Sequence, residues 1–266
     1  MEAVTPLSGG SINHVYLLKT DRGDFCLKMN DAGKHPGMFE SEAKGLAVLE
    51  TAGDLKVPRP VFQATLERHS FLLLEYLTPA RPGPGMWHRF GRALARLHRH
   101  SAEQYGLSFD NYMGSLPQCN RFHTGWSEFF ITERLEPQVR LAREQGFDLR
   151  ADFESLYPKL DRLFPREKPS LIHGDLWNGN YLVSGKGEAA LIDPAVYYGH
   201  READLAMTTL FGGFHGDFYE GYEEEFPLER GWRQRLDLYN LYPLLIHLNL
   251  FGSSYLWEIR RILDRY

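Results

Sequence analysis

Two stretches of the sequence decide how the chain is interpreted: Leu171-Ile-His-Gly-Asp-Leu-Trp-Asn-Gly-Asn180 and, shortly after it, Leu191-Ile-Asp-Pro194. They supply a carboxylate at Asp175, a carboxamide at Asn180 and a second carboxylate at Asp193. Catalysts of phosphoryl transfer mostly position the reactants and neutralise phosphate oxygens with cations and metal ions. One carboxylate accepts the hydroxyl proton, while an amide and a second carboxylate bind Mg²⁺. The two stretches therefore predict a phosphotransfer site that uses Mg²⁺.

The spacing within the first stretch supports this prediction. A protein-kinase catalytic loop separates its catalytic Asp from its metal-binding Asn as this chain separates Asp175 from Asn180, and Gly174 stands where that signature has Arg. The alternative is a turn in which Asp175 and Asn180 hydrogen-bond to nearby backbone. Because Asn180 is in register and an apolar strand leads into Asp193, we favour the catalytic interpretation.

Composition excludes several classes of protein. The chain has 266 residues and is 43% hydrophobic, enough for one large domain or two lobes with a sizeable core. Its net charge of −5 disfavours nucleic acid and anionic membranes as partners. Two cysteines, Cys26 and Cys119, are too few for a disulfide framework, and no signal peptide or transmembrane segment is predicted. We therefore expect a cytoplasmic protein.

The N-terminal segment contains a glycine pair between apolar residues. Ser8-Gly-Gly-Ser11 predicts a hairpin with Gly9 and Gly10 at its tip. Glycines let backbone N–H groups approach nucleotide phosphates closely, as in the Gly-rich loop of kinases. An ordinary hairpin turn explains the same residues, since the full G-x-G-x-x-G pattern is missing.

A lysine follows in an apolar strand, Phe25-Cys-Leu-Lys-Met29. A buried Lys28 needs an anionic partner, and in kinases the corresponding lysine meets the α- and β-phosphates and is oriented by a helical Glu. A helix predicted over residues 38–49 offers Glu40 and Glu42, of which we choose Glu42 although the sequence does not decide. An edge-strand lysine beside a solvated helical glutamate is equally compatible.

Residues 78–85 are rich in proline and glycine and follow two predicted strands, at 57–61 and 70–77. They predict a connection between lobes, in which the backbone of Glu75, Tyr76 and Leu77 hydrogen-bonds adenine. A buried strand that leads to a surface loop is an equal alternative.

The remainder of the chain is predicted to be mainly helical. Apolar spacing indicates helices over 87–100, 126–143 and 152–164. His98 and His100 do not share a helical face, so we expect a solvated helix end. Asp204 is expected to cap backbone amides or brace the catalytic loop. The acidic, aromatic segment 214–226 predicts a solvated helix with buried rings or, alternatively, a surface that attracts a cationic amine.

Taken together, the motifs resemble the fructosamine kinase (ketosamine-3-kinase) family within the aminoglycoside phosphotransferase and choline kinase group. His-Gly-Asp-x-x-x-x-Asn marks only the larger group, whereas residues 193–207 with Trp177 resemble the ketosamine branch more closely. The resemblance implies an α+β, protein-kinase-like fold with a small β-rich lobe over 1–78 and a larger helical lobe over 79–266. It is carried by these residues: Ser8-Gly-Gly-Ser-Ile-Asn13, Lys28, 39–43, 173–180, 193–207 and Phe211-Gly-Gly-Phe214.

The resemblance also implies a reaction, the ATP-dependent phosphorylation of the 3-hydroxyl of a ketosamine, free or on a glycated protein. The product then breaks down and releases the amine, which reverses glycation. By position, the resemblance implies that Asp175 accepts the proton and that Asn180 and Asp193 bind Mg²⁺. It implies that Lys28 with Glu42 clamps the phosphates, that Gly9 and Gly10 form the nucleotide loop, and that Glu75, Tyr76 and Leu77 bind adenine. Trp177 would form the wall of the sugar pocket or else be a core aromatic residue.

The sequence departs from related kinases in two places, which bears on the expected oligomeric state and substrate class. Some relatives carry a cysteine in the Gly-rich loop that permits redox-controlled dimers, but this chain has Ser11, so we expect a monomer without that switch. No Ala-Pro-Glu follows Asp193, which argues against a signalling protein kinase. The alternatives left open are a kinase for another hydroxylated amine, such as an aminoglycoside or choline, and a non-catalytic nucleotide-binding regulator.

Overall fold

The computed structural model describes residues 3–7 and 12–266, so Gly9, Gly10 and Ser11 lie outside the described residues. The chain forms two compact units, each assembled from three separate stretches. The first unit comprises Met1–Leu97, Asn178–Ala195 and His215–Phe226. The second unit comprises His98–Trp177, Val196–Phe214 and Pro227–Tyr266.

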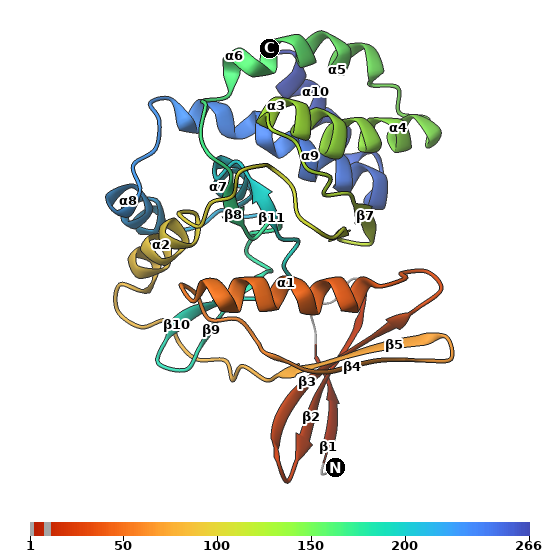
Figure 1. The fold of residues 1–266 in the computed structure, drawn as a ribbon, viewed down its shortest axis with the longest axis vertical. Coiled ribbons are helices and arrows are strands. Elements are labelled where there is room, and N and C mark those ends of the chain that lie inside the picture. The colour runs from red at the N-terminus through yellow and green to blue at the C-terminus, as the bar shows by residue number, and fades with distance from the viewer. Residues whose placement is uncertain (1–2, 8–11) are drawn as a thin grey trace. The chain divides into compact units, whose positions relative to one another are not determined.

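A five-stranded antiparallel sheet dominates the first unit (Figure 1). Its strand order is β1-β2-β3-β5-β4, so β3 is the central strand and bonds to β2 and β5. The alternative of an edge-strand lysine is therefore wrong, because Lys28 lies on β3 between Val15 and Leu72. The strands are β1 (Ala3–Pro6), β2 (His14–Thr20), β3 (Gly23–Asp31), β4 (Pro60–Leu66) and β5 (His69–Glu75).

Helix α1 (Met38–Ala52) packs on this sheet through β4 and β5. Phe39, Leu46 and Leu49 are buried, as their helical spacing requires for an apolar face. Gly53 ends the helix at φ +76°, and its N–H donates to the Leu49 carbonyl at 3.2 Å, a common way to satisfy the last turn. The predicted helix is confirmed and brings the Glu42 side of α1 toward the sheet.

The first unit also contains the hairpin of β9 (Tyr181–Ser184) and β10 (Glu188–Leu191), and two helices in close contact, α2 (Met86–Leu97) and α8 (Gly216–Glu225). Glycines permit the helix contact: a Cβ at Gly91 would lie 1.9 Å from the Phe218 carbonyl oxygen, and one at Gly221 would lie 2.2 Å from that of His88. Phe218 is fully buried, so the prediction of a helix with buried rings at 214–226 is confirmed.

The second unit is mainly helical, with two small antiparallel sheets, β6 with β7 and β8 with β11. Within residues 3–7 and 12–266, every helix is too short or too polar to span a lipid bilayer. The elements are β6 (Asn111–Met113), β7 (Leu116–Gln118), α3 (Trp126–Phe129), the π-helical η1 (Phe130–Leu135), α4 (Glu136–Glu144), α5 (Arg150–Leu156), η2 (Tyr157–Lys159), α6 (Leu160–Leu163), β8 (Ser170–Ile172), β11 (Tyr197–Gly199), α7 (Glu202–Met207), α9 (Trp232–Phe251), η3 (Ser253–Tyr255) and α10 (Leu256–Leu263).

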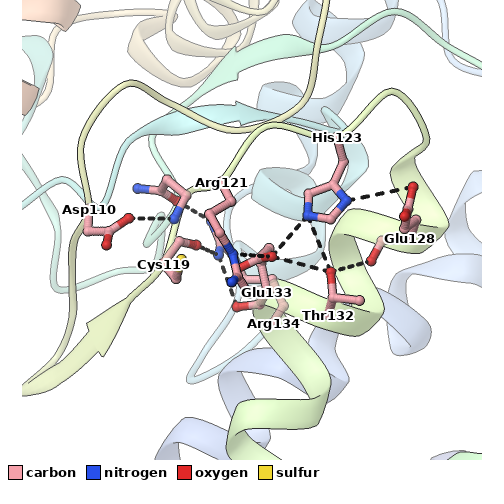
Figure 2. Close-up of polar contacts among 9 residues, drawn as sticks. Asp110, Cys119, Arg121, His123, Glu128, Thr132, Glu133 and Arg134 are labelled. Atoms are coloured by element: carbon pink, nitrogen blue, oxygen red, sulfur yellow. Dashed lines mark hydrogen bonds and ion pairs between the residues drawn. The ribbon is translucent and has the colours of Figure 1, made fainter.

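The π-helical segment η1 contains two buried charged residues, Glu133 and Arg134, and Figure 2 shows their polar contacts. The Glu133 carboxylate accepts a hydrogen bond from Arg121 Nε at 3.1 Å. Arg134 is fully buried, donates to Asn120 Oδ1 at 2.6 Å and lies 4.0 Å from the centre of the Tyr197 ring. Hydrogen bonds and the aromatic face offset the cost of burying the guanidinium. Helical periodicity alone did not predict these inward charges.

A further cluster of ion pairs links the start of α7 to Glu167 and to α9. Arg201 bonds to Glu167 at 2.6 Å and Arg235 bonds to Glu202 at 2.5 Å. His200 is fully buried beside them and accepts a hydrogen bond from the Glu202 N–H through Nδ1 at 3.2 Å. Burial lowers the pKa of His200 to about 4, with the Glu167 carboxylate opposing.

The contact between α2 and α8 yields a stability prediction. Gly91→Ala places a Cβ against backbone, so the helices must separate, and we expect a loss of about 1–3 kcal/mol in the free energy of unfolding. Gly216→Ala on α8 is the matched control, since its Cβ would meet nothing within 4 Å. Chemical denaturation measures both variants, and equal stabilities would contradict the proposed close packing.

His200 yields a pH prediction. The unfolded chain takes up the histidine proton near pH 6.5, whereas the folded chain does so only near pH 4. Stability is therefore intact above pH 6.5 and declines as the pH falls toward 4, by roughly 2 kcal/mol between pH 7 and pH 5. His200→Asn keeps a hydrogen-bond acceptor but does not titrate, so urea denaturation should show a smaller acid loss for the variant. Parallel pH curves for the two proteins would refute this assignment.

Candidate active site

Lys28 occupies the centre of a buried ion cluster in the first unit. Its side chain is 7% exposed, and Nζ donates to Glu42 Oε1 at 2.6 Å and to Asp193 Oδ1. Glu42 belongs to α1, and Asp193 follows β10, so a strand, a helix and a loop meet at one ammonium group. A buried charge is tolerated when it is paired and hydrogen-bonded in this way.

The cluster keeps Lys28 charged. Burial alone would lower the pKa of Lys28, but the Asp193 and Glu42 carboxylates outweigh it and raise that pKa above its usual value. Burial raises the pKa of Glu42, with Lys28 opposing the increase. An ammonium fixed between two carboxylates is therefore present at neutral pH.

The structure decides between the two candidate glutamates. Glu42 contacts Lys28, whereas Glu40 pairs with Lys44 one turn along α1 at 2.7 Å, and that pair is half-exposed. Residues two apart on a helix point in different directions, so only one of the two can face the sheet. The choice of Glu42 is confirmed as a contact.

The β9–β10 hairpin brings the two candidate metal ligands to the same end. Tyr181 pairs with Leu191, and the Ile192 N–H donates to the Asn180 carbonyl at 3.0 Å, one residue before Asp193. Asp193 has φ +54°, a left-handed conformation that is strained for a non-glycine residue. Its side chain is 47% exposed although it bonds to the buried Lys28. The backbone thus holds one carboxylate oxygen for Lys28 and leaves the group accessible.

The donor set fits Mg²⁺. Asn180 and Asp193 offer hard oxygen atoms, and the described residues contain no cluster of three or more His, Cys, Asp or Glu side chains able to hold a metal. Mg²⁺ is usually bound by one or two protein oxygens together with water and substrate phosphates. Two ligands of this kind suit a metal that arrives with a nucleotide.

In the second unit, Asp204 fixes the loop that carries Asp175. Its carboxylate is 1% exposed and accepts hydrogen bonds from the His173 N–H at 2.7 Å, the Gly174 N–H at 2.8 Å and His98 Nε2 at 3.2 Å. Burial would raise the pKa of Asp204, but these donors lower it. The structural role predicted for Asp204 is confirmed. The prediction that His98 lies at a solvated helix end was wrong, because His98 is buried and hydrogen-bonds to this carboxylate.

Gly174 explains why the loop differs from the kinase signature. Its φ is +83°, a left-handed conformation that glycine adopts without strain. The next N–H, that of Asp175, donates to His173 Nδ1 at 3.3 Å. The turn therefore sets the backbone of Asp175 by local contacts and the buried Asp204.

The other predicted residues divide between the units. Glu75 ends β5, and its N–H already donates to the Arg59 carbonyl at 2.9 Å. Tyr76 and Leu77 follow it in the first unit, and Leu77 is buried. Trp177 lies in the second unit, where its ring meets Phe211 edge to face with centroids 5.8 Å apart. Their adenine and sugar contacts stay predictions.

Known proteins resemble this chain over its whole length. The family model described as "Fructosamine kinase" matches residues 1–266, and the chain belongs to this family. A "Probable ketoamine kinase" from Synechocystis sp. is 40% identical over 97% of this chain and 88% of that protein. A chloroplastic "Protein-ribulosamine 3-kinase" from Oryza sativa subsp. indica is 37% identical over 99% of this chain and 78% of that protein.

A solved structure named "putative fructosamine-3-kinase", from Thermobifida fusca, superposes with a TM-score of 0.88 at 36% identity, over 99% of this chain and 94% of that chain. Solved aminoglycoside phosphotransferases share the fold at much lower identity. The comparisons confirm the predicted family, the α+β kinase-like fold and the assignment to phosphotransferases that act on a hydroxyl group.

Asp204 yields a prediction about the catalytic loop. Asp204→Asn removes a charge and one acceptor oxygen, which leaves one of three buried donors unsatisfied. We expect the free energy of unfolding to fall by about 1–3 kcal/mol. Thermal and chemical denaturation measure the loss, with Asp152→Asn on the exposed face of α5 as the control. An Asp204→Asn protein as stable as that control would show that the carboxylate does not brace the loop.

Proposed function

We propose that this protein uses ATP and Mg²⁺ to phosphorylate the 3-hydroxyl of ketosamines of the fructosamine and ribulosamine type. One observation carries the proposal: Lys28 is buried between Glu42 and the accessible Asp193, and the residue before Asp193, Ile192, donates its N–H to the Asn180 carbonyl. A fixed ammonium next to hard oxygen ligands suits the phosphates of a nucleotide and their metal ion. The names of the rice and Thermobifida relatives support the 3-hydroxyl of a ketosamine as the acceptor.

Each residue has one task in this proposal. Lys28, oriented by Glu42, binds the α- and β-phosphates, and the backbone of Glu75, Tyr76 and Leu77 binds adenine. Gly9 and Gly10 cover the phosphates. Asn180 and Asp193 hold Mg²⁺, which supplies positive charge to the phosphate oxygens when bound.

Asp175 accepts the proton of the sugar hydroxyl as the phosphoryl group is transferred, while Trp177 lines the sugar. Asp204 holds the Asp175 loop in place through the His173 and Gly174 amides. A loop held in this way is preorganised, and preorganisation lowers the barrier of the chemical step.

The phosphorylated ketosamine then decomposes and releases its amine, so the reaction removes sugar from amines or glycated proteins. We propose that the protein performs this repair as a monomer in the cytoplasm. The names of the curated relatives favour ketosamines over aminoglycosides and choline as substrates.

Asp175→Asn tests the proposal. An amide cannot accept the hydroxyl proton, so we expect ADP release with a fructosamine or ribulosamine to fall by about 10²–10⁴-fold while ATP affinity is retained. Asp152→Asn is the matched control. An aminoglycoside and choline serve as comparison substrates, and turnover of one of these without turnover of a ketosamine would contradict the assignment. Full ketosamine turnover by Asp175→Asn would contradict the role of Asp175.

A further inference from the structure

We propose that a cluster of five aromatic rings in the second unit binds the amine of the ketosamine and the substituent that this amine carries. The inference rests on the proposed function and names the part of the substrate that lies beyond the sugar. We call these rings the amine-side cluster; its members are Trp177, Phe211, His247, Phe251 and Tyr255.

The cluster is continuous in the chain with the catalytic loop, since Trp177 lies two residues after Asp175. From Trp177 the contacts extend to Phe211 at 5.8 Å and then to His247 at 4.6 Å between ring centroids. Tyr255 and Phe251 contact His247 at 5.1 and 5.5 Å. His247 is therefore at the centre of the rings.

Two of the five rings are exposed. Phe251 is 55% exposed and Phe211 is 38% exposed. Phe211 also has φ +53°, a rare conformation for an aromatic residue, and it is followed by Gly212 and Gly213, which have positive φ as well. Grouped apolar side chains left in water mark binding surfaces, and backbone strain concentrates at ligand sites.

His247 gives the cluster a polar centre of defined direction. Its Nδ1 lies 2.7 Å from the Pro243 carbonyl, which can only accept, so Nδ1 carries the proton. Burial lowers the pKa of His247, with that carbonyl opposing, and the ring is neutral at physiological pH. The other ring nitrogen, Nε2, is then a hydrogen-bond acceptor.

An acceptor among aromatic faces matches the chemistry of a protonated secondary amine. Such an amine has N–H groups to donate to Nε2 and a positive charge that aromatic faces attract. The amine of a ketosamine lies between the sugar and its substituent, and Trp177, two residues after Asp175, belongs to the cluster, so we place the amine of a sugar bound at Asp175 against these rings. A ketose without an amine offers neither the donor nor the charge.

Two ligands of one shape separate this proposal from simple apolar contact. 1-Benzylamino-1-deoxyfructose carries the ammonium, whereas 1-O-benzylfructose replaces it with an ether oxygen. Wild-type protein should prefer the amine by about 10-fold or more, both in kcat/KM and in calorimetric affinity. His247→Phe keeps a ring but removes the acceptor, and Phe211→Asn removes a ring while tolerating positive φ. Both variants should lower this ratio at least threefold, because each loses part of the amine contact.

Phe62→Ala is the control, since Phe62 is 61% exposed on β4 of the first unit, and its ratio should match that of the wild type. An equal loss for both ligands in the cluster variants, or no amine preference in the wild type, would overturn the inference. Sedimentation shows whether Phe251→Ser dissociates a dimer. If it does, and the ratio of amine to ether affinity is unchanged, the cluster is a contact between copies of this chain, which would also overturn the inference.

The two proposals fail separately. Absence of phosphorylation with either ligand contradicts the proposed function, whereas the calorimetric ratio does not depend on turnover. If the wild type still binds the amine ligand more tightly in calorimetry and the cluster variants do not, binding of the amine at His247 remains supported even without phosphorylation.

Discussion

The ion cluster of Lys28, Glu42 and Asp193 is the constraint on which the first unit depends. Glu42 is 14 residues and Asp193 165 residues from Lys28, and their elements meet only when the sheet, α1 and the β9–β10 hairpin have assembled. Lys28 and Glu42 would each be a costly buried charge without the other, whereas Asp193 is 47% exposed. The same contacts that complete the fold therefore hold a buried ammonium against an accessible carboxylate.

Asp204 performs a related task in the second unit with hydrogen bonds in place of an ion cluster. Two backbone amides and His98 donate to its carboxylate, so Asp204 holds the two residues before Asp175 in place. In both units, a buried carboxylate, Glu42 or Asp204, thus fixes the position of a candidate site residue or loop. This arrangement explains why the loop that carries Asp175 can be short and contain glycine and still be held firmly.

Sequence reasoning succeeded where function demands particular residue types at short spacing. The apolar strand around Lys28 and the helix with Glu42 are local patterns, and each predicts its element directly, whereas the roles predicted from the Asp175 to Asn180 interval stay predictions. Contacts between residues that are far apart in the sequence could not be predicted in this way. Solvation of His98 was the natural expectation from helical spacing, because the partner Asp204 lies 106 residues away. The inward Arg134 was missed for a similar reason, since its partners include a remote tyrosine ring and a π-helical turn.

The cooperation of Lys28 and Glu42 is tested most directly by a double-mutant cycle on the affinity for Mg²⁺–ATP, measured by calorimetry with wild type, Lys28→Met, Glu42→Gln and the double variant. If Glu42 acts by orienting Lys28, each single change should weaken binding, and the double variant should bind about as well as Lys28→Met alone. Unchanged affinity in Glu42→Gln, or losses that simply add, would contradict the account.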